Sequence, residues 1–133
     1  PTNAFYTPRQ RYKADSLLVF QKQLAKDGIR SVIGFTAKDI STATPDWGVF
    51  GLGYCPGKAC VISTYRLKKA SVTTVQLKER LIKVVLHELG HNLGLPHCTF
   101  NKECLLTDAG GTIKQVDRER KWLCSKCTQI LHQ

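Results

Sequence analysis

The sequence predicts a single α+β (mixed α/β) domain in which helices pack against one twisted sheet. Its 133 residues are enough for one compact domain and too few for two ordinary ones. Hydrophobic residues make up 42% and charged residues 23%, which is near the globular average, so a packed core is expected. Strand-like and helix-like segments also follow one another along the chain. We therefore expect residues 1–133 to form one domain.

The first third of the chain predicts a lead-in, a helix, a strand and a loop. Residues 7–10 should be extended, because proline disfavours helix just before it. Residues 12–27 place apolar side chains three, four and seven apart on one helical face, and Gly28 is suited to end that helix. Residues 29–36 are rich in β-branched and aromatic types and predict a strand. Residues 38–48 predict a loop.

The middle of the chain predicts a hairpin that leads into a long helix. Residues 49–54 predict a glycine-rich strand. Glycine weakens a strand, so its presence there indicates that another backbone approaches closely. The alternative interpretation is that the glycines mark a bend or a bulge. A turn over residues 55–60 and a third strand over residues 61–65 follow. Residues 66–71 then lead into a helix over residues 72–93, whose apolar residues cover much of its circumference and predict burial.

The end of the chain predicts a turn and one last helix. Residues 105–111 contain threonine, aspartate and two glycines and read as a turn region. Residues 116–131 place apolar side chains at helical spacing and predict a single helix.

The long helix carries the pattern HExxHxxGxxH at His87, Glu88, His91 and His97. Residues four apart lie on one helical face, so His87 and His91 can bind one metal ion. The carboxylate of Glu88 can reach a water in the open fourth position without being a ligand. Gly94 accepts the left-handed conformation that ends a helix, which lets His97 return to the same ion.

This motif resembles the metzincin clan of zinc peptidases, and the residues after it narrow the resemblance. His97 is followed by Cys98 and Cys104, and later by Cys124 and Cys127 in a CxxC. The layout resembles the archaemetzincin family, closely in the central and C-terminal third of the chain and in outline elsewhere. The resemblance implies a metzincin-like zincin fold, with a twisted mixed sheet packed against an active-site helix and a small C-terminal helical part. It also implies that the glycine-rich strand lies at the sheet edge above the metal and pairs with extended substrate.

The expected chemistry is zinc-dependent hydrolysis of peptide bonds. His87, His91 and His97 would hold a catalytic zinc, which lowers the pKa of a bound water toward about 7. Glu88 would take the proton as general base and deliver it to the leaving amine. The substrate class, peptides or small proteins, follows from the family alone.

A second zinc is expected at Cys98, Cys104, Cys124 and Cys127. CxxC is a frequent zinc corner, and four thiolates leave no open position, so this site would be structural. It would tether the last helix to the segment after His97. Disulfides are the competing interpretation and a CxxC redox pair a weaker one. The expected cofactors are therefore two zinc ions.

Three further features bear on this prediction. Cys55 and Cys60 are left over, and two free thiols are favoured over a bridge across the hairpin. Five residues separate Cys98 from Cys104, where the family pattern has four. Leu106 stands where the family has a methionine beneath the zinc ligands, and such a swap typically costs less than about 1.5 kcal/mol.

Charge and composition set the expected partners. The net charge of +10 comes from lysines and arginines spread along the chain, which favours a solvated basic surface, with nucleic acid unlikely as a partner. No run of eighteen apolar residues is present, so no membrane span is expected. No signal-peptide pattern is seen, and we expect a cytoplasmic monomer. The alternative function is a non-catalytic zinc-binding module that contacts acidic or nucleic-acid partners; Glu88 favours the enzyme, because such a module needs no general base.

Overall fold

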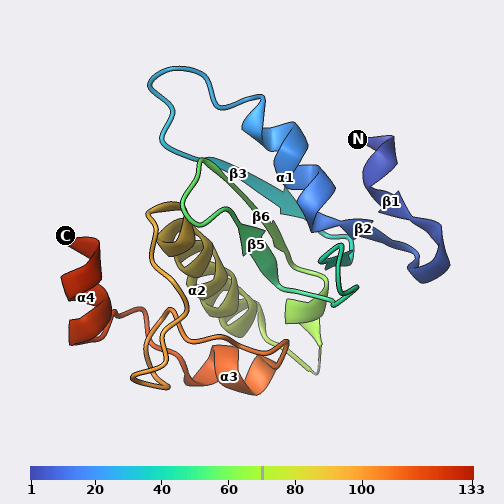
Figure 1. Cartoon of the computed structure of the whole chain (residues 1–133). Coiled ribbons are helices and arrows are strands. Elements are labelled where there is room, and N and C mark those ends of the chain that lie inside the picture. The colour runs from blue at the N-terminus through green and yellow to red at the C-terminus, as the bar shows by residue number, and fades with distance from the viewer. Residues whose placement is uncertain (70) are drawn as a thin grey trace.

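The computed structural model describes residues 1–69 and 71–133. Within them, the strands precede the long helix, and this helix and two shorter ones end the chain (Figure 1), which confirms the mixed α+β class. The strands are β1 (Phe5–Tyr6), β2 (Arg11–Lys13), β3 (Val32–Thr36), β4 (Ile40–Ser41), β5 (Gly51–Gly53) and β6 (Ala59–Ser63). The α-helices are α1 (Ala14–Lys22), α2 (Thr74–Asn92), α3 (Ile113–Arg118) and α4 (Ser125–Leu131). Short 3-10 helices cover Thr2–Ala4, Thr7–Arg9 and Arg66–Lys68.

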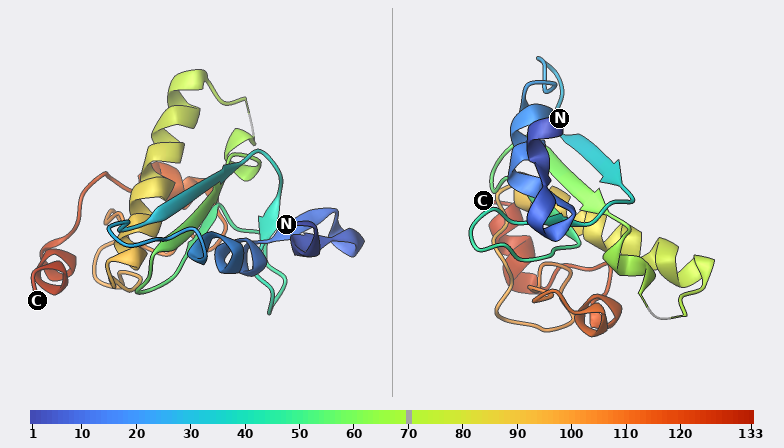
Figure 2. Two further views of the ribbon diagram at one scale, coloured as in Figure 1. Left: turned by 90° about the horizontal axis from the view of Figure 1, so that it is seen from above. Right: turned by 90° about the vertical axis from the view of Figure 1, so that its right-hand side faces the viewer.

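The main sheet lies between α1 and α2, as Figures 1 and 2 show. Its strand order is β3-β6-β5, with β3 parallel and β5 antiparallel to β6, so the sheet is mixed as expected. All five residues of the central strand β6 are buried. Cys60 and Ile62 pack in one core cluster with α2, whereas Ala59 and Val61 pack in another with α1. Successive side chains of a strand point to opposite faces of the sheet, so α1 and α2 each pack against a separate set of β6 side chains.

A second small sheet, of order β1-β2-β4, was not predicted from the sequence. Its strand β4 lies within the predicted loop of residues 38–48, and residues 7–9 form a 3-10 helix instead of extended chain. Ion pairs hold this region together: Asp46 accepts from Arg11 at 2.8 Å, and Asp39 pairs with Arg66 at 2.7 Å. These contacts join residues about 30 positions apart in the chain, so no local sequence pattern predicts them.

The predicted single helix over residues 116–131 is wrong, because the structure has two helices there. Glu119 follows α3 with extended backbone, and the chain then pairs with a distant segment. The amide of Arg120 donates to the carbonyl of Glu103 at 2.9 Å, and Leu105 donates to Trp122 at 2.9 Å. These backbone bonds replace helical ones between α3 and α4 and override the local propensity. The first helix is also shorter than the predicted range of residues 12–27: it begins at Ala14 and ends at Lys22.

Helix α2 begins one residue after Thr73, whose side chain forms a reciprocal capping box with Gln76. It was expected to be buried nearly all round, but Val75 is 73% exposed, so the helix is amphipathic. The predicted lead-in over residues 66–71 includes residue 70, which lies outside the described residues. At its C-terminal end, Gly94 has the expected positive φ of 92°. Gly94 and Leu95 donate back to His91 and Gly90, in the two bonds of a Schellman motif.

The glycines of β5 allow α2 to lie close to the sheet. A Cβ at Gly51 would fall 2.9 Å from Cγ of Glu88, and one at Gly53 would fall 3.1 Å from the backbone oxygen of Glu88. Close packing of α2 therefore requires glycine in β5; the approach of a substrate backbone, to which the sequence analysis assigned these glycines, stays a prediction. Strand β5 is also an edge of its sheet, as the family resemblance implied.

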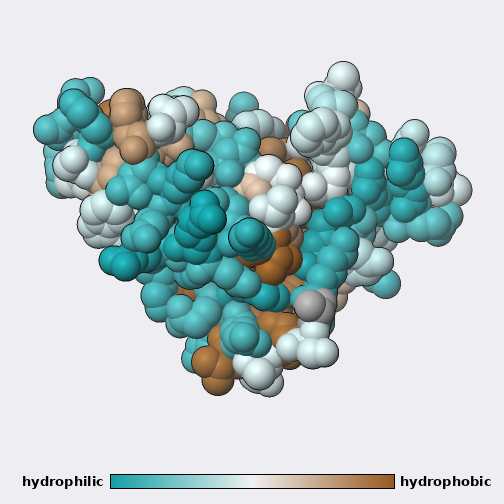
Figure 3. Space-filling view, turned by 90° about the horizontal axis from the view of Figure 1, so that it is seen from below, coloured by the Kyte–Doolittle hydropathy of each residue, from teal (hydrophilic) through white to brown (hydrophobic). Residues whose placement is uncertain are grey.

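The face shown in Figure 3 is largely hydrophilic, with apolar areas near its centre, its lower edge and its upper left. No helix in the described ranges has both the length and the apolar composition needed to cross a membrane.

Candidate metal centres and active-site cavity

A cavity of about 590 Å³ lies against β5, α2 and residues 108–111, which follow Cys104 in the chain. Four cavity-lining residues of α2 are Val84, His87, Glu88 and His91. Their spacing of three, four and seven residues puts them on one helical face. His97 also lines the cavity, so the structure brings the three predicted histidines and Glu88 together.

Two of the histidine rings are oriented by backbone carbonyl groups. Nδ1 of His87 lies 2.7 Å from the oxygen of Leu105, and Nδ1 of His91 lies 2.7 Å from the oxygen of Leu95. A carbonyl oxygen only accepts, so Nδ1 carries the proton in each ring. In the neutral rings both Nε2 atoms are then unprotonated, although they face each other at 3.0 Å. Two facing lone pairs repel unless a cation lies between them, so this arrangement fits a metal ion.

The third histidine reaches the same place from beyond the helix. The Schellman turn reverses the chain after α2, and the His97 ring centroid lies 4.7 Å from that of His91 and 5.3 Å from that of His87. One ring nitrogen of each histidine lies within 4.8 Å of those of the others. His91 is buried and His97 is exposed, so the set is open on the side of His97. Three imidazoles with an open side are the donor set of a catalytic zinc.

Burial tunes the protonation of these groups. Burial lowers the pKa of His87 to about 4 and also lowers the pKa of His91, so both rings are neutral donors at neutral pH. Burial raises the pKa of Glu88 to about 8. The Glu88 side chain is 6% exposed and lies beside Gly51, which leaves room for its carboxylate. A carboxyl group whose pKa lies near neutrality is suited to taking and returning a proton.

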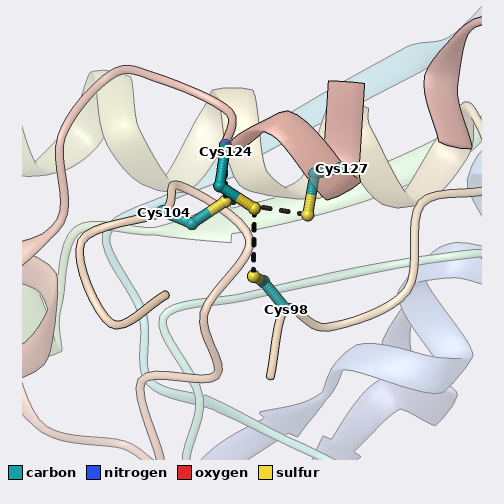
Figure 4. A group of neighbouring side chains, drawn as sticks. All are labelled: Cys98, Cys104, Cys124 and Cys127. Atoms are coloured by element: carbon teal, nitrogen blue, oxygen red, sulfur yellow. Dashed lines mark hydrogen bonds between the residues drawn. The ribbon is translucent and has the colours of Figure 1, made fainter. Parts of the chain in front are cut away.

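The four predicted cysteines also converge, as Figure 4 shows. Sγ of Cys98 lies 3.7 Å from that of Cys124, and Sγ of Cys104 lies 3.7 Å from that of Cys127. Bonded sulfurs are about 2.0 Å apart, so these pairs are not disulfides. Ligands at about 2.3 Å around a tetrahedral zinc are about 3.8 Å apart, which these distances match.

The cluster favours a thiolate at Cys124 and disfavours one at Cys104 and Cys127, because burial raises the pKa of these two thiols. All four cysteines are buried, and none is in a disulfide. Burial raises the pKa of Cys124, but hydrogen bonds from the Cys127 amide and from the other thiols lower it to about 7. The amide of Cys124 in turn donates to Sγ of Cys104 at 3.4 Å. A closed, buried set of four thiols with such hydrogen bonds fits a structural zinc.

Three consecutive residues connect the two clusters. Cys104 belongs to the thiol cluster, Leu105 binds the His87 ring through its carbonyl group, and Leu106 lies beneath α2. A Cβ at Gly90 would meet the Leu106 side chain at 3.1 Å, and Leu106 is fully buried. The carbonyl group of Leu106 also accepts from the amide of Cys98 at 2.7 Å. Leucine therefore fills the apolar position where the resemblance leads one to expect methionine.

The remaining cysteines are separate from both clusters. Cys55 and Cys60 are free thiols, as the favoured interpretation held. Cys60 faces Gly53 across the ladder, so it does not oppose Cys55. Burial raises the pKa of Cys60 to about 11, and that thiol stays protonated.

Several contributors to the site were missed from the sequence. The carbonyl groups of Leu95 and Leu105 have no side-chain signature. Asn92 donates to the carbonyl oxygens of Tyr54 and Ala59, both at 3.0 Å, and so ties the end of α2 to the hairpin. Glu119 lines the cavity from beyond α3. Its position depends on the break in the last helix, which no local pattern predicted.

Comparisons with known proteins agree with this geometry. The model of peptidase family M54 matches residues 4–133. An archaemetzincin of Haloquadratum walsbyi is 33% identical over 99% of this chain and 78% of its own length. One of Halobacterium salinarum is 35% identical over 98% of this chain and 77% of its own.

Solved structures agree as well. The crystal structure of archaemetzincin from Methanopyrus kandleri superimposes with a TM-score of 0.88 at 32% identity, over 99% of this chain and 70% of that one. That of archaemetzincin from Archaeoglobus fulgidus, complexed with malonate, gives 0.81 at 29% identity, over 97% and 75%.

Proposed function

Because the chain belongs to peptidase family M54 and is a zinc metallopeptidase, we propose that His87, His91 and His97 hold its catalytic zinc and that Glu88 is its general base. The observation that carries this proposal is the pair of facing Nε2 atoms 3.0 Å apart, with both Nδ1 protons committed to carbonyl groups. Such a pair needs a cation, and the neighbouring His97 supplies a third donor.

The residues around the cavity have different roles in the proposed peptide hydrolysis. When bound, zinc supplies Lewis-acid chemistry, which acidifies a water molecule and polarises the scissile carbonyl group. Glu88 takes the proton of the attacking water and returns it to the leaving amine. Leu95 and Leu105 keep the histidine rings in the tautomer that leaves Nε2 free. Strand β5 offers an open sheet edge beside the cavity, to which extended substrate can add as a further strand.

We further propose that Cys98, Cys104, Cys124 and Cys127 hold a structural zinc. The 3.7 Å sulfur separations and the full burial of the cluster support this assignment. The metal would fix Cys98, and through it the adjacent His97, to the start of α4. The structural site would thus position the third ligand of the catalytic site.

The chain would act as one domain and as a monomer on peptides or small proteins. The family assignment favours the enzyme over a non-catalytic zinc-binding module. The basic charge is spread over the chain, and it supports solvation of the surface rather than binding of nucleic acid.

Metal content tests this assignment directly. Protein purified without chelator should contain close to two zinc ions per chain, because two complete donor sets are present. His91→Ala should lower the content to about one, and Cys127→Ser should remove the other ion. Elemental analysis with a thiol titration makes the measurement. A parent value that stays near one, with Cys124 and Cys127 oxidised to a disulfide, would contradict the second site.

A further inference from the structure

Two acidic side chains are buried in the described ranges, and both line the same cavity. Glu88 is 6% exposed and Glu119 is 4% exposed; no other aspartate or glutamate in the described ranges is buried. The proposed mechanism gives Glu88 a role and leaves Glu119 without one. Glu119 comes from a different part of the chain, just after α3, so its approach to the cavity is a product of the fold.

In the described ranges Glu119 forms no ion pair, although this chain has 20 lysines and arginines and only 10 acidic residues. Half of the acidic residues form ion pairs, namely Asp39, Asp46, Glu79, Glu103 and Asp117; within the described part of the chain, none of these pairs includes Glu119. The amide of Gln115 lies 3.5 Å from its carboxylate but donates more closely, at 2.8 Å, to the carbonyl group of Lys102. A buried carboxylate without a cation is costly, and burial raises the pKa of Glu119 to about 7.

The two nearby cations hydrogen-bond to other groups, although the charge of Lys83 still lowers the pKa of Glu119 and partly offsets the effect of burial. Lys83 donates to the carbonyl oxygens of Val116 and Asp117 at 3.0 and 3.2 Å. Arg80 is buried and pairs with both carboxylate oxygens of Asp117 at 2.8 Å. Both cations lie on α2, so they fasten the last turn of α3 to that helix. Glu119 follows this fastened turn directly and is therefore held at the cavity without forming an ion pair with Lys83 or Arg80.

The cavity around Glu119 fits a long side chain with a positive tip. Phe50, Val84 and Val116 are buried and line the same cavity as Glu119 and the three histidines. Apolar walls suit the methylene stem of lysine or arginine, whose charged end needs an acceptor. Asp108 also lines the cavity but is exposed, so Glu119 is the buried carboxylate, apart from the proposed general base, that can fix orientation in this mostly apolar pocket.

We propose that Glu119 is a specificity-determining residue, which binds the cationic side chain of a lysine or arginine close to the scissile bond of the substrate. The inference rests on the proposed peptidase function, because it places a peptide in this cavity. The inference predicts that this protein prefers substrates with a basic residue, although its own net charge of +10 repels such substrates at long range. The local ion pair outweighs that repulsion because it is formed inside the cavity.

Peptide affinity tests the inference separately from catalysis. The zinc-loaded Glu88→Gln variant should bind substrate peptides without cleaving them. In this background, calorimetry compares a fixed peptide that carries lysine or norleucine at each position in turn. At one position, lysine should give at least about tenfold tighter binding, the usual effect of a charged hydrogen bond. Adding Glu119→Gln should remove this preference and leave the norleucine peptides unchanged.

Two further variants control for structure. Glu103→Gln removes an exposed carboxylate that pairs with Arg120 and does not line the cavity, so the lysine preference should persist. Glu119→Asp keeps the charge and should retain part of the preference even if Glu119→Gln destabilises the fold. Equal binding of lysine and norleucine peptides at every position, or no binding, would overturn the role of Glu119. Absence of zinc-dependent hydrolysis by the parent chain would instead count against the peptidase function.

Discussion

Replacing Glu88 by glutamine should lower peptide hydrolysis by about 10²–10⁴-fold, the usual loss when general acid–base help is removed. The substitution keeps the shape of a buried side chain and leaves His87, His91 and His97 in place. Both zinc ions and the melting temperature should therefore stay close to those of the parent. The measurement is kcat/KM on a cleaved peptide, together with metal analysis of the same preparation.

Two variants make this result specific. Glu79→Gln carries the same substitution on the same helix, at an exposed carboxylate that pairs with Lys121, and it should keep full activity. His91→Ala should lose the catalytic zinc as well as activity, which separates chemistry from metal retention. If the Glu88 variant retained parental activity, or lost its zinc, the assignment of Glu88 as general base would fail.

Loss of one cysteine of the buried cluster should destabilise the protein much more than loss of the exposed histidine. Cys124→Ser or Cys127→Ser should lower Tm by on the order of 10 °C, since structural zinc binding is coupled to folding. His97→Ala should change Tm by only about 2 °C, because its site lies on an already packed helix. Differential scanning calorimetry on zinc-loaded protein gives both values.

Cys60→Ser is the matched control for this comparison. Cys60 is fully buried but belongs to neither donor set, so its variant reports the cost of burying a hydroxyl group alone. A chelator should still lower the Tm of Cys60→Ser, as in the parent, and should have little further effect on Cys124→Ser. A larger loss of Tm in His97→Ala than in either cluster variant would contradict the structural role of the thiols.

Sequence reasoning worked best where one residue type is needed for one local reason. Gly94 ends α2 with positive φ, as its position after the motif predicted. The spacing of His87 and His91 placed both rings on one helical face, and the structure brings their Nε2 atoms together. Each of these inferences depends on a few neighbouring residues.

The features that sequence reasoning missed depend on long-range contacts. Strands of two or three residues, such as β1 and β4, have too little pattern to be recognised. The last helix is broken because residues 120–122 bond to residues 103–105, which are near only in the folded protein. That break brings Glu119 to the cavity, so its proposed role could not be predicted without the fold. The carbonyl groups that orient the histidines are equally invisible in a sequence.

Cleavage of a diverse peptide library by the zinc-loaded parent chain tests the central claim most directly. Mass spectrometry should find defined cleavage products that disappear when a chelator removes the metal, return when zinc is restored, and are absent with Glu88→Gln. The same protein should be folded before and after chelation of the catalytic ion, so that loss of activity reports chemistry. A library that stays intact with fully zinc-loaded, folded protein, or cleavage that persists without metal, would contradict the account.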